Sequence, residues 1–430
     1  MARVGRLAVL ARSLSGRHHE VHFACRHFDD RVFASGEFLR HEIDTVERDG
    51  IHDGSPRGAG IYDVHALRRR ARQEIELIEA IEPDVVVGDL RPSLSTSAAK
   101  CGVPLMTLIN AYWSPYAIRE SFPVPDHPMV ALMGERLARL CAVGTMPLAF
   151  RSLARPVNAL RKAYGLPKIG KGLGGKHGGL LDILTHGDFT LYPDIPSLVP
   201  TAGLPASHRY TGPIHWSPDV PLPPWWDRWC ERGEAGTPLV YVAGGLSGGS
   251  SGSVSALRTI VTALASMPVA FAVATAGPAG EALARLGPLP NNGFSAPFVP
   301  EHLACRWASL VISDGGSASG YRALQAGTPV VGVASTIDQH LAMQTMQERG
   351  VGIRVRAQGL SVRAVRSSVR AVLANDRYHY NAYHVAEEFK RWEAPLVFGG
   401  LLDEIEAKGL SRRLSRLVGY TPPRAIATLH

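Results

Sequence analysis

The sequence has little cysteine, and none of it is spaced as in a metal or redox site. The cysteines are scattered and no CxxC pair occurs, so neither a disulfide framework nor a zinc site is supported. We therefore expect reduced thiols, as in a cytosolic protein. The five cysteines are Cys25, Cys101, Cys141, Cys230 and Cys305.

Long apolar runs and dense basic runs are lacking as well. No apolar run reaches the length that spans a bilayer, and no Lys/Arg run interleaved with aromatic residues points to a nucleic acid. The net charge of +8 suits an acidic ligand or an anionic surface. We expect a cytoplasmic protein with a small acidic ligand and no nucleic acid partner, and contact with a membrane surface stays open.

The length of 430 residues exceeds one ordinary hydrophobic core, so two domains are expected. In the first half, short apolar strands at 84–89 and 103–109 alternate with helices at 66–81 and 96–101. Continuous apolar strands between helices are typical of a parallel sheet covered on both faces. The sequence therefore predicts an α/β fold with two Rossmann-like, doubly wound domains.

The amino-acid composition indicates where the domains are expected to begin and end. The stretch 206–236 is rich in proline and reads as a linker between domains. We predict a first domain over 1–205, a second over 237–405 and a C-terminal tail over 406–430.

The first domain lacks the strand with which an α/β domain normally starts. Val4, Leu7, Ala11 and Leu14 recur at helical spacing, so the chain begins inside a helix, and an alternating strand follows at 21–24.

Polar and aromatic residues follow two strands of the first domain. Asp89 ends one strand, and Asn110, Trp113 and Tyr116 come after the next. Ligands of doubly wound sheets bind beyond the carboxyl ends of the strands, so we predict that these residues line a ligand cleft. For Asp89, a structural part as a helix cap or loop carboxylate is the alternative.

The second half contains the most informative stretch. A β-branched strand runs into Gly315 and Gly316, and a helix begins at about Ser317. A glycine pair before a helix lets the backbone approach an anion, and the helix dipole favours negative charge there. A second strand delivers Asp338 and Gln339, a carboxylate and an amide that can bind the rest of such a ligand, with capping of the helix that follows as the alternative.

A second glycine-rich turn, 244–252, follows another buried strand of the same half. It has neither the GxGxxG pattern of dinucleotide-binding proteins nor a Walker lysine, so neither NAD nor an ATPase is favoured. Two such turns at one sheet edge predict a site for a diphosphate-bearing ligand.

These motifs, taken in order, resemble the donor-binding signature of the UDP-glycosyltransferase superfamily. The family comprises inverting GT-B enzymes that include bacterial macrolide glycosyltransferases, and its pattern is V-P, H-G-G, A-L-x-x-G-x-P and D-Q. The matching segments are Val299-Pro300, Asp314-Gly315-Gly316-Ser317, Ala323-Leu324-Gln325-Ala326-Gly327-Thr328-Pro329 and Asp338-Gln339. The N-terminal segment and Tyr210-Thr211-Gly212-Pro213 fit the family more loosely.

The resemblance implies two facing domains, with an acceptor bound to the first and a nucleotide-sugar to the second. It implies that the backbone of Val299 meets the nucleobase and that Asp338 and Gln339 bind sugar hydroxyls. The diphosphate is expected on Gly315, Gly316 and Ser317, assisted by Gly245 and Ser247. Because family members neutralise the phosphates with amides and a helix dipole, the resemblance implies no metal and no resident cofactor, with the nucleotide-sugar as co-substrate.

Three positions depart from the family pattern. Asp314 replaces the histidine of H-G-G, and because a carboxylate repels a diphosphate, we expect its side chain to turn away or to cap the helix. Leu246 stands where a hydroxyl residue often meets phosphate. The family's general base, a histidine after the first strand, aligns with Arg3, and arginine cannot act as a base at ordinary pH. Asp89, the counterpart of the aspartate that orients that histidine, remains.

Two explanations of the missing base stay open. The gene could encode the strand and the histidine upstream of Met1, or the chain is a divergent member that uses another base. Candidate replacements are Asp89 and the strand-entry histidines His18, His19 and His22.

The sequence therefore predicts a glycosyltransferase that moves a sugar, with inversion, from a nucleotide diphosphate donor to a small lipophilic or lipid-like acceptor. The alternatives are a non-catalytic nucleotide-sugar-binding protein or inactive homologue, and a nucleotide-sugar epimerase on the same fold.

Overall fold

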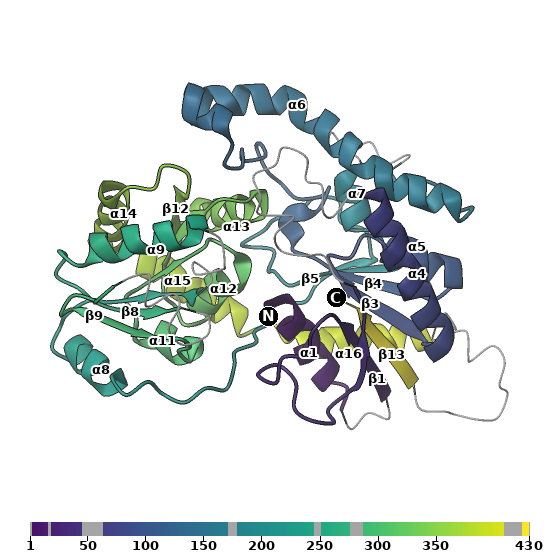
Figure 1. Ribbon diagram of the computed structural model, residues 1–430, viewed down its shortest axis with the longest axis horizontal. Helices are drawn as coiled ribbons and strands as arrows, with labels where there is room; N and C mark the ends of the chain where they lie inside the picture. Colours follow the sequence, from purple (N-terminus) through teal and green to yellow (C-terminus); the bar gives the residue numbers. More distant parts are fainter. Residues whose placement is uncertain are drawn as a thin grey trace. The chain divides into compact units, whose positions relative to one another are not determined.

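The computed structural model describes residues 2–15, 19–44, 63–170, 179–244, 251–275, 287–407 and 424–429. They form two compact units, each built on a parallel sheet with helices on its faces, which confirms the predicted α/β fold (Figure 1). Unit 1 comprises Met1–Ser121, Cys141–Trp216 and Trp392–His430, and unit 2 comprises Phe122–Leu140 and Ser217–Arg391. This division differs from the predicted boundaries at 122–140 and 392–405, which belong to the opposite unit from the one expected.

The sheet of unit 1 has the strand order β2-β1-β13-β3-β4-β5-β6, and every adjacent pair is parallel. Its strands are β1 (His19–Cys25), β2 (Leu39–Glu42), β3 (Val85–Asp89), β4 (Leu105–Leu108), β5 (Phe189–Tyr192), β6 (His208–Tyr210) and β13 (Arg424–Leu429).

The chain starts in a helix as expected, but the place beside β3 is filled. β13 lies between β1 and β3, with Ile426 opposite Val85 and Val21 opposite Ile426 on the other side. Tail composition gave no hint of this pairing. The segment thus supplies the central strand that the beginning of the sequence lacks.

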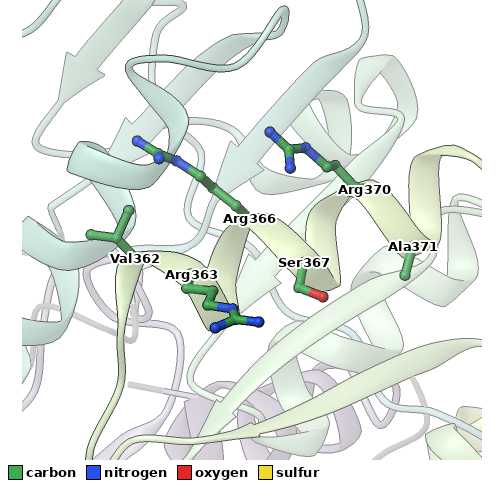
Figure 2. A pocket seen from close by; sticks show the side chains of 6 residues that line it. All are labelled: Val362, Arg363, Arg366, Ser367, Arg370 and Ala371. Carbon is green, nitrogen blue, oxygen red and sulfur yellow. The ribbon is translucent and has the colours of Figure 1, made fainter.

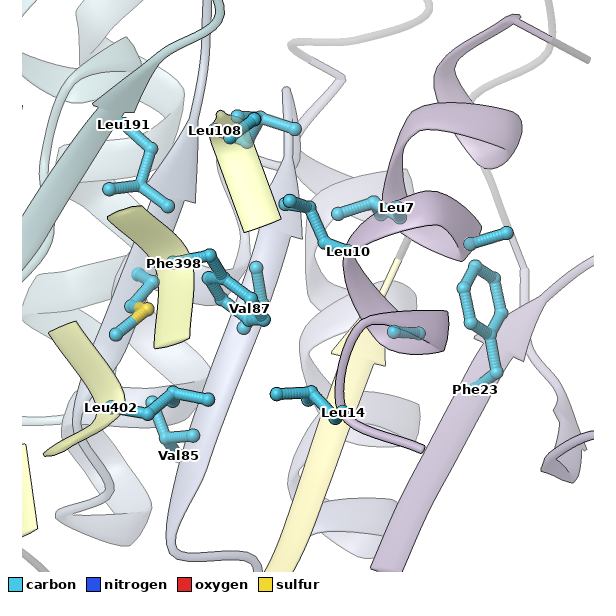
Figure 3. Packing of buried hydrophobic residues seen from close by; sticks show 14 of the residues in the cluster. Leu7, Leu10, Leu14, Phe23, Val85, Val87, Leu108, Leu191, Phe398 and Leu402 are labelled. Carbon is cyan, nitrogen blue, oxygen red and sulfur yellow. The ribbon is translucent and has the colours of Figure 1, made fainter. Parts of the chain in front are cut away.

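The helices of unit 1 cover both faces of this sheet. They are α1 (Ala2–Arg12), α4 (Val64–Ile81), α5 (Leu94–Cys101), the short 3₁₀ helix η1 (Ala111–Trp113), α7 (Leu180–Leu184) and α16 (Ala394–Ala407). Figure 3 shows the apolar core on one face, where Leu10 of α1, Leu14 in the turn after α1 and Phe398 of α16 pack with Val85 and Val87 of β3. This core holds α1 and β3 in a fixed relation, which positions the polar groups at their ends.

Helix α6 (Pro128–Ala163) connects the first segment of unit 2 to unit 1. Gly134 within it is non-helical, with φ 77° and ψ 160°, so the element consists of two helical pieces. The second piece continues through 143–146 and past Pro147, because a proline interrupts the hydrogen bonding of a helix without always ending it.

The sheet of unit 2 has the order β12-β11-β10-β7-β8-β9 and is also parallel throughout. Its strands are β7 (Leu239–Val242), β8 (Ala270–Ala274), β9 (Gly293–Ala296), β10 (Leu310–Ser313), β11 (Val330–Ala334) and β12 (Gly352–Arg356). Its helices are α8 (Trp226–Glu234), α9 (Ser251–Leu264), α11 (Glu301–Trp307), α12 (Ser317–Gln325), α13 (Ile337–Glu348), α14 (Val362–Leu373) and α15 (Arg377–Phe389).

Helices α9 and α14 pack on one face of this second sheet and share an apolar core with its central strands. β10 and β7 are almost completely buried, so their carboxyl ends emerge at a fixed edge. Among the described residues, no helix combines the length and the apolar composition needed to cross a membrane.

Candidate functional site

The glycine turn after β10 requires glycine for steric reasons. Gly315 has φ +80°, and a Cβ atom there would lie 2.9 Å from Cγ of Met343. On the neighbouring strand β11, a Cβ atom on Gly332 would lie 2.9 Å from Cα of Gly315. Two glycines from different strands therefore let the turn approach β11 closely.

The turn leads directly into α12, whose first N–H groups have no partner within the helix. Gly316 is its N-cap, and Ser317 is its first residue and is buried. The amino end of a helix attracts negative charge, so this is the predicted diphosphate position. Gly245 and Ser247, predicted to assist there, lie outside the described residues, as does Leu246.

The turn already holds a negative group of the protein itself. The N–H of Gly316 donates to Oδ1 of Asp314 at 3.1 Å, and the N–H of Gly315 donates to Oγ of Ser313 at 3.1 Å. The carboxylate of Asp314 therefore does not turn away from the loop, because it accepts a hydrogen bond from the loop's own backbone.

The predicted sugar-binding pair lies in the first turn of α13. Thr336 is the N-cap, and the side-chain Oε1 of Gln339 accepts from the N–H of Thr336 at 3.1 Å and from Ser335 at 3.0 Å. Gln339 therefore caps α13, as the structural alternative predicted. Its Nε2 also donates to Oδ2 of Asp314 at 3.2 Å, which brings the two predicted donor motifs together.

Val299 lies just before α11 and is buried. The chain immediately before it, Ser295–Phe298, lines a pocket of about 350 Å³ together with Pro221–Trp225 and Arg228. The indole N–H of Trp225 donates to the carbonyl of Ser295 at 2.7 Å, which fixes one wall of this pocket.

A further contact at the Asp338–Gln339 turn was not predicted. The N–H of Asp126 donates to the carbonyl of Ser335 at 3.0 Å, and its carboxylate accepts from the N–H of Gln358 at 2.6 Å and from Arg356 at 3.0 Å. His340 lies 3.4 Å from the same carboxylate, and burial lowers its pKa against the opposing effect of Asp126.

Residues 122–127 thus pack on the strand-to-helix turn that carries the predicted sugar-binding pair. The only signal in the sequence was the pair of alternating arginines, Arg354 and Arg356, in β12. Such a pattern cannot reveal a partner some 230 positions away.

In unit 1, Asp89 ends β3 with a completely buried side chain. Nε and Nη2 of Arg6 donate to its two carboxylate oxygens, each at 2.8 Å, so the ion pair is bidentate. A substrate hydroxyl would therefore compete with Arg6 for the carboxylate of Asp89, because each oxygen already accepts one hydrogen bond.

The other predicted residues of this edge belong to one network. Nη1 of Arg6 donates to the side chain of Asn110 at 3.1 Å, and Asn110 donates to Asp194 at 2.9 Å. Trp113 in η1 is buried. Tyr116 is half-buried with its ring edge-on to His208, at 5.4 Å between centroids. Asn110 is therefore a structural link, and Tyr116 is more open to a ligand than Trp113.

Arg3, at the position of the family's base, lies in α1 and not in a loop after a strand, and the candidate histidines that the structure describes do not lie beside Asp89. His19 begins β1, at the amino edge of a parallel sheet, whereas Asp89 lies at the carboxyl edge. His22 contacts His41 at 2.9 Å and Glu20 at 2.7 Å, and His18 lies outside the described residues.

A wider, shallow pocket of about 750 Å³ lies along α14 and is lined by none of the predicted donor residues. Figure 2 shows Arg366 and Arg370 projecting to the same side of the helix. Arg366 donates to the carbonyl of Ala263 at 3.2 Å, so it ties α14 to α9. Among the described residues, no group of three or more His, Cys, Asp or Glu side chains could hold a metal ion.

A protein-family model and several known proteins are similar to this chain. Residues 273–396 match the model of the erythromycin biosynthesis protein CIII-like C-terminal domain, which includes the turns at Gly315 and Asp338. The chain is 38% identical over 389 residues to a PGL/p-HBAD biosynthesis glycosyltransferase of Mycobacterium tuberculosis, covering 90% of this chain and 86% of the relative.

Two Mycobacterium bovis proteins are similarly related. A PGL/p-HBAD biosynthesis rhamnosyltransferase is 37% identical over 391 residues, covering 91% of this chain and 82% of the relative. An inactive PGL/p-HBAD biosynthesis glycosyltransferase is 40% identical over 251 residues, covering 58% and 65%.

Among solved structures, spinosyn rhamnosyltransferase SpnG complexed with thymidine diphosphate has a TM-score of 0.62 at 18% identity, covering 94% of this chain and 97% of that one. That likeness concerns the fold, while the sequence relatives span most of both chains. The chain therefore belongs to the UDP-glycosyltransferase superfamily and has the GT-B fold.

Proposed function

We propose that this protein transfers a sugar, with inversion, from a nucleoside diphosphate sugar to a small lipophilic acceptor. The observation that carries the proposal is the convergence of two separate motifs at one sheet edge. Asp314 of the glycine turn is hydrogen-bonded to Gln339 of the second turn at 3.2 Å. A ligand with a diphosphate and a sugar matches a site that joins a helix amino end to a carboxylate-amide pair.

Each part of the donor has a proposed position. The diphosphate would lie at Gly315, Gly316 and Ser317, with Gly245 and Ser247 assisting. Backbone amides and a helix amino end stabilise the negative charge that develops on a leaving diphosphate, so this chemistry requires no metal. Val299 would meet the nucleobase, and Asp338 would bind sugar hydroxyls.

Two similar proteins suggest which sugar and which nucleotide the donor contains. A rhamnosyltransferase at 37% identity and a fold neighbour complexed with thymidine diphosphate favour a deoxyhexose on thymidine diphosphate. The acceptor would meet unit 1 near Tyr116, which is the most open of the predicted acceptor residues. A lipid-like acceptor at a membrane surface is consistent with the net charge of +8.

A second function, binding a nucleotide-sugar without transfer, is favoured by one specific observation. Asp89 is the proposed catalytic carboxylate of unit 1, and Arg6 holds both of its oxygens. A similar protein of Mycobacterium bovis is described as an inactive glycosyltransferase, which supports this alternative. The epimerase alternative finds no support in these relatives.

Nucleotide binding is the first test of the donor site. We expect thymidine diphosphate or uridine diphosphate to raise the melting temperature of the purified protein, because a ligand that binds only the folded state stabilises it. If no nucleoside diphosphate changes the melting temperature, the donor-site proposal fails.

Sugar transfer separates the two functions. We expect Asp338→Ala to abolish transfer from TDP-rhamnose or UDP-glucose to lipophilic phenols while nucleotide binding stays nearly unchanged. Asp227→Asn in α8 is the control, since it removes one exposed carboxylate of unit 2 away from the turns. Equal loss of binding and transfer in the Asp338 variant would show that Asp338 is structural. Binding without any transfer by the wild type would favour the non-catalytic protein.

A further inference from the structure

Asp314 stands at the point where the proposed donor would place its diphosphate. It follows the last residue of β10 and is half-buried, so solvent only partly screens its charge. One oxygen accepts from the N–H of Gly316 at the beginning of α12, and the other accepts from Nε2 of Gln339. The two donors come from different turns, so the carboxylate links the glycine turn to the sugar-binding turn.

These same donors are the groups that an incoming ligand would need. An N–H at a helix amino end and an uncharged side-chain amide favour an anion that accepts hydrogen bonds. A diphosphate that took the N–H of Gly316 would lie within a few ångströms of the Asp314 carboxylate, and like charges repel strongly in a partly buried site.

We propose that Asp314 is a resident anion of the donor site, which the diphosphate must displace before it can bind. The inference rests on the proposed function, since it takes the glycine turn as the diphosphate position. Displacing Asp314 breaks its bond to Gln339 and releases the side-chain amide for the sugar. Binding of the diphosphate and release of the sugar-binding amide are thereby coupled through one side chain.

A consequence is weak affinity for the nucleoside diphosphate that remains after transfer. That product has no sugar to bond the released Gln339, so the Asp314–Gln339 contact can form again and compete with it. The arrangement favours an intact nucleotide-sugar over the free nucleoside diphosphate.

A bridging cation is the main competing explanation, since a carboxylate beside a diphosphate can share a divalent metal. The described residues offer no group of three ligands for a metal, and both oxygens of Asp314 already accept hydrogen bonds from the protein. These hydrogen bonds therefore favour the resident-anion explanation over a bridging metal.

The test is titration calorimetry of the full chain with thymidine diphosphate and uridine diphosphate, each with magnesium and with EDTA. Asp314→Asn keeps the side-chain shape without its charge, and we expect it to bind the nucleotide about tenfold more tightly or better, with and without magnesium. Asp314→Ala should show the same direction, and Asp227→Asn should bind like the wild type.

Each of the other possible results contradicts either the resident-anion proposal or the proposed function. Unchanged or weaker binding by both folded Asp314 variants, with measurable binding by the wild type, refutes the resident anion and leaves the donor site intact. Wild-type binding that needs magnesium, with the need lost in Asp314→Asn, refutes it in favour of a metal bridge. If neither the wild type nor any variant binds a nucleoside diphosphate, the proposed function itself fails.

Discussion

Two aspartates lie at the carboxyl ends of central strands, one in each sheet, and the protein holds their carboxylates with different kinds of partner. Asp89 at the end of β3 is completely buried and paired with both nitrogens of an arginine fork. Asp314 after β10 is half-buried and accepts from a backbone N–H and an uncharged amide. A buried ion pair resists separation, whereas a carboxylate held by neutral donors can give way to another anion.

The difference extends beyond these two residues. Unit 1 contains a second buried ion pair, Arg91 with Glu74 at 2.6 Å, with side chains at most 2% exposed. The site of unit 2 is built chiefly from glycine turns, helix ends and a capping glutamine. Buried ion pairs therefore hold the edge of unit 1, whereas the glycine turn of unit 2 depends on backbone geometry, and the more exposed Asp126–Arg356 pair supports the neighbouring turn.

The largest effect should come from breaking the Arg6–Asp89 pair. Arg6→Met leaves a buried carboxylate without its cation, so we expect the free energy of unfolding to fall by about 3–5 kcal/mol. Urea denaturation measures this loss. Arg6→Met combined with Asp89→Leu removes both charges and should recover a large part of it. A loss below about 0.5 kcal/mol in the single variant would show that the pair does not stabilise unit 1.

Acid should weaken unit 1 through its buried histidines. Burial lowers the pKa of His208 to about 4, so it is neutral in the folded protein while the unfolded chain binds a proton below its ordinary value of 6.5. Its stabilising contribution is present above pH 6.5 and is lost as the pH falls toward 4. We expect a loss of about 2 kcal/mol at pH 5 relative to pH 7.

The His208→Gln variant isolates this effect. Its unfolding free energy, measured by urea denaturation at both pH values, should change less between pH 7 and pH 5 than that of the wild type. An identical pH dependence would exclude His208 as the source.

A smaller loss is expected from Gly315→Ala, which tests backbone geometry in unit 2. An alanine at φ +80° is strained and would press on Met343, so stability should fall by about 1–2 kcal/mol. Gly359→Ala is a matched control, because that glycine has φ +74° with no heavy atom within 4 Å of the added Cβ. Thermal melts compare the two variants, and only Gly315→Ala should also weaken nucleotide binding. If both variants bind the nucleotide equally well, the glycine turn is not part of the donor site.

The sequence predicted the strands, turns and helices around Gly315 and Asp338 better than it predicted the contacts of Asp89, and the reason is local chemistry. Gly315, Gly316 and Asp338 lie in short motifs whose strand, turn and helix are specified by neighbouring residues. The Arg6–Asp89 pair joins positions 83 apart, and no local pattern encodes it. The same holds for Asp126, whose partners lie more than 200 positions away.

The side chain of Asp314 shows a second limit of sequence reasoning. We expected a carboxylate to turn away from a diphosphate site or to cap the helix. The structure shows it accepting from Gly316 next to the N-cap and also from Gln339. Sequence could indicate that the residue was unusual, but the partner of its second oxygen depended on how β10 and β11 bring their turns together.

The position of β13 has a consequence for how this chain is made. Its partner β3 is synthesised about 340 residues earlier, because Ile426 pairs with Val85. At translation rates of about 5–20 residues per second, β3 waits roughly 20–70 s and β1 roughly 20–80 s beside an unfilled position. Unpaired strand edges invite association with other chains, so unit 1 depends on protection of these edges until translation brings β13 into place.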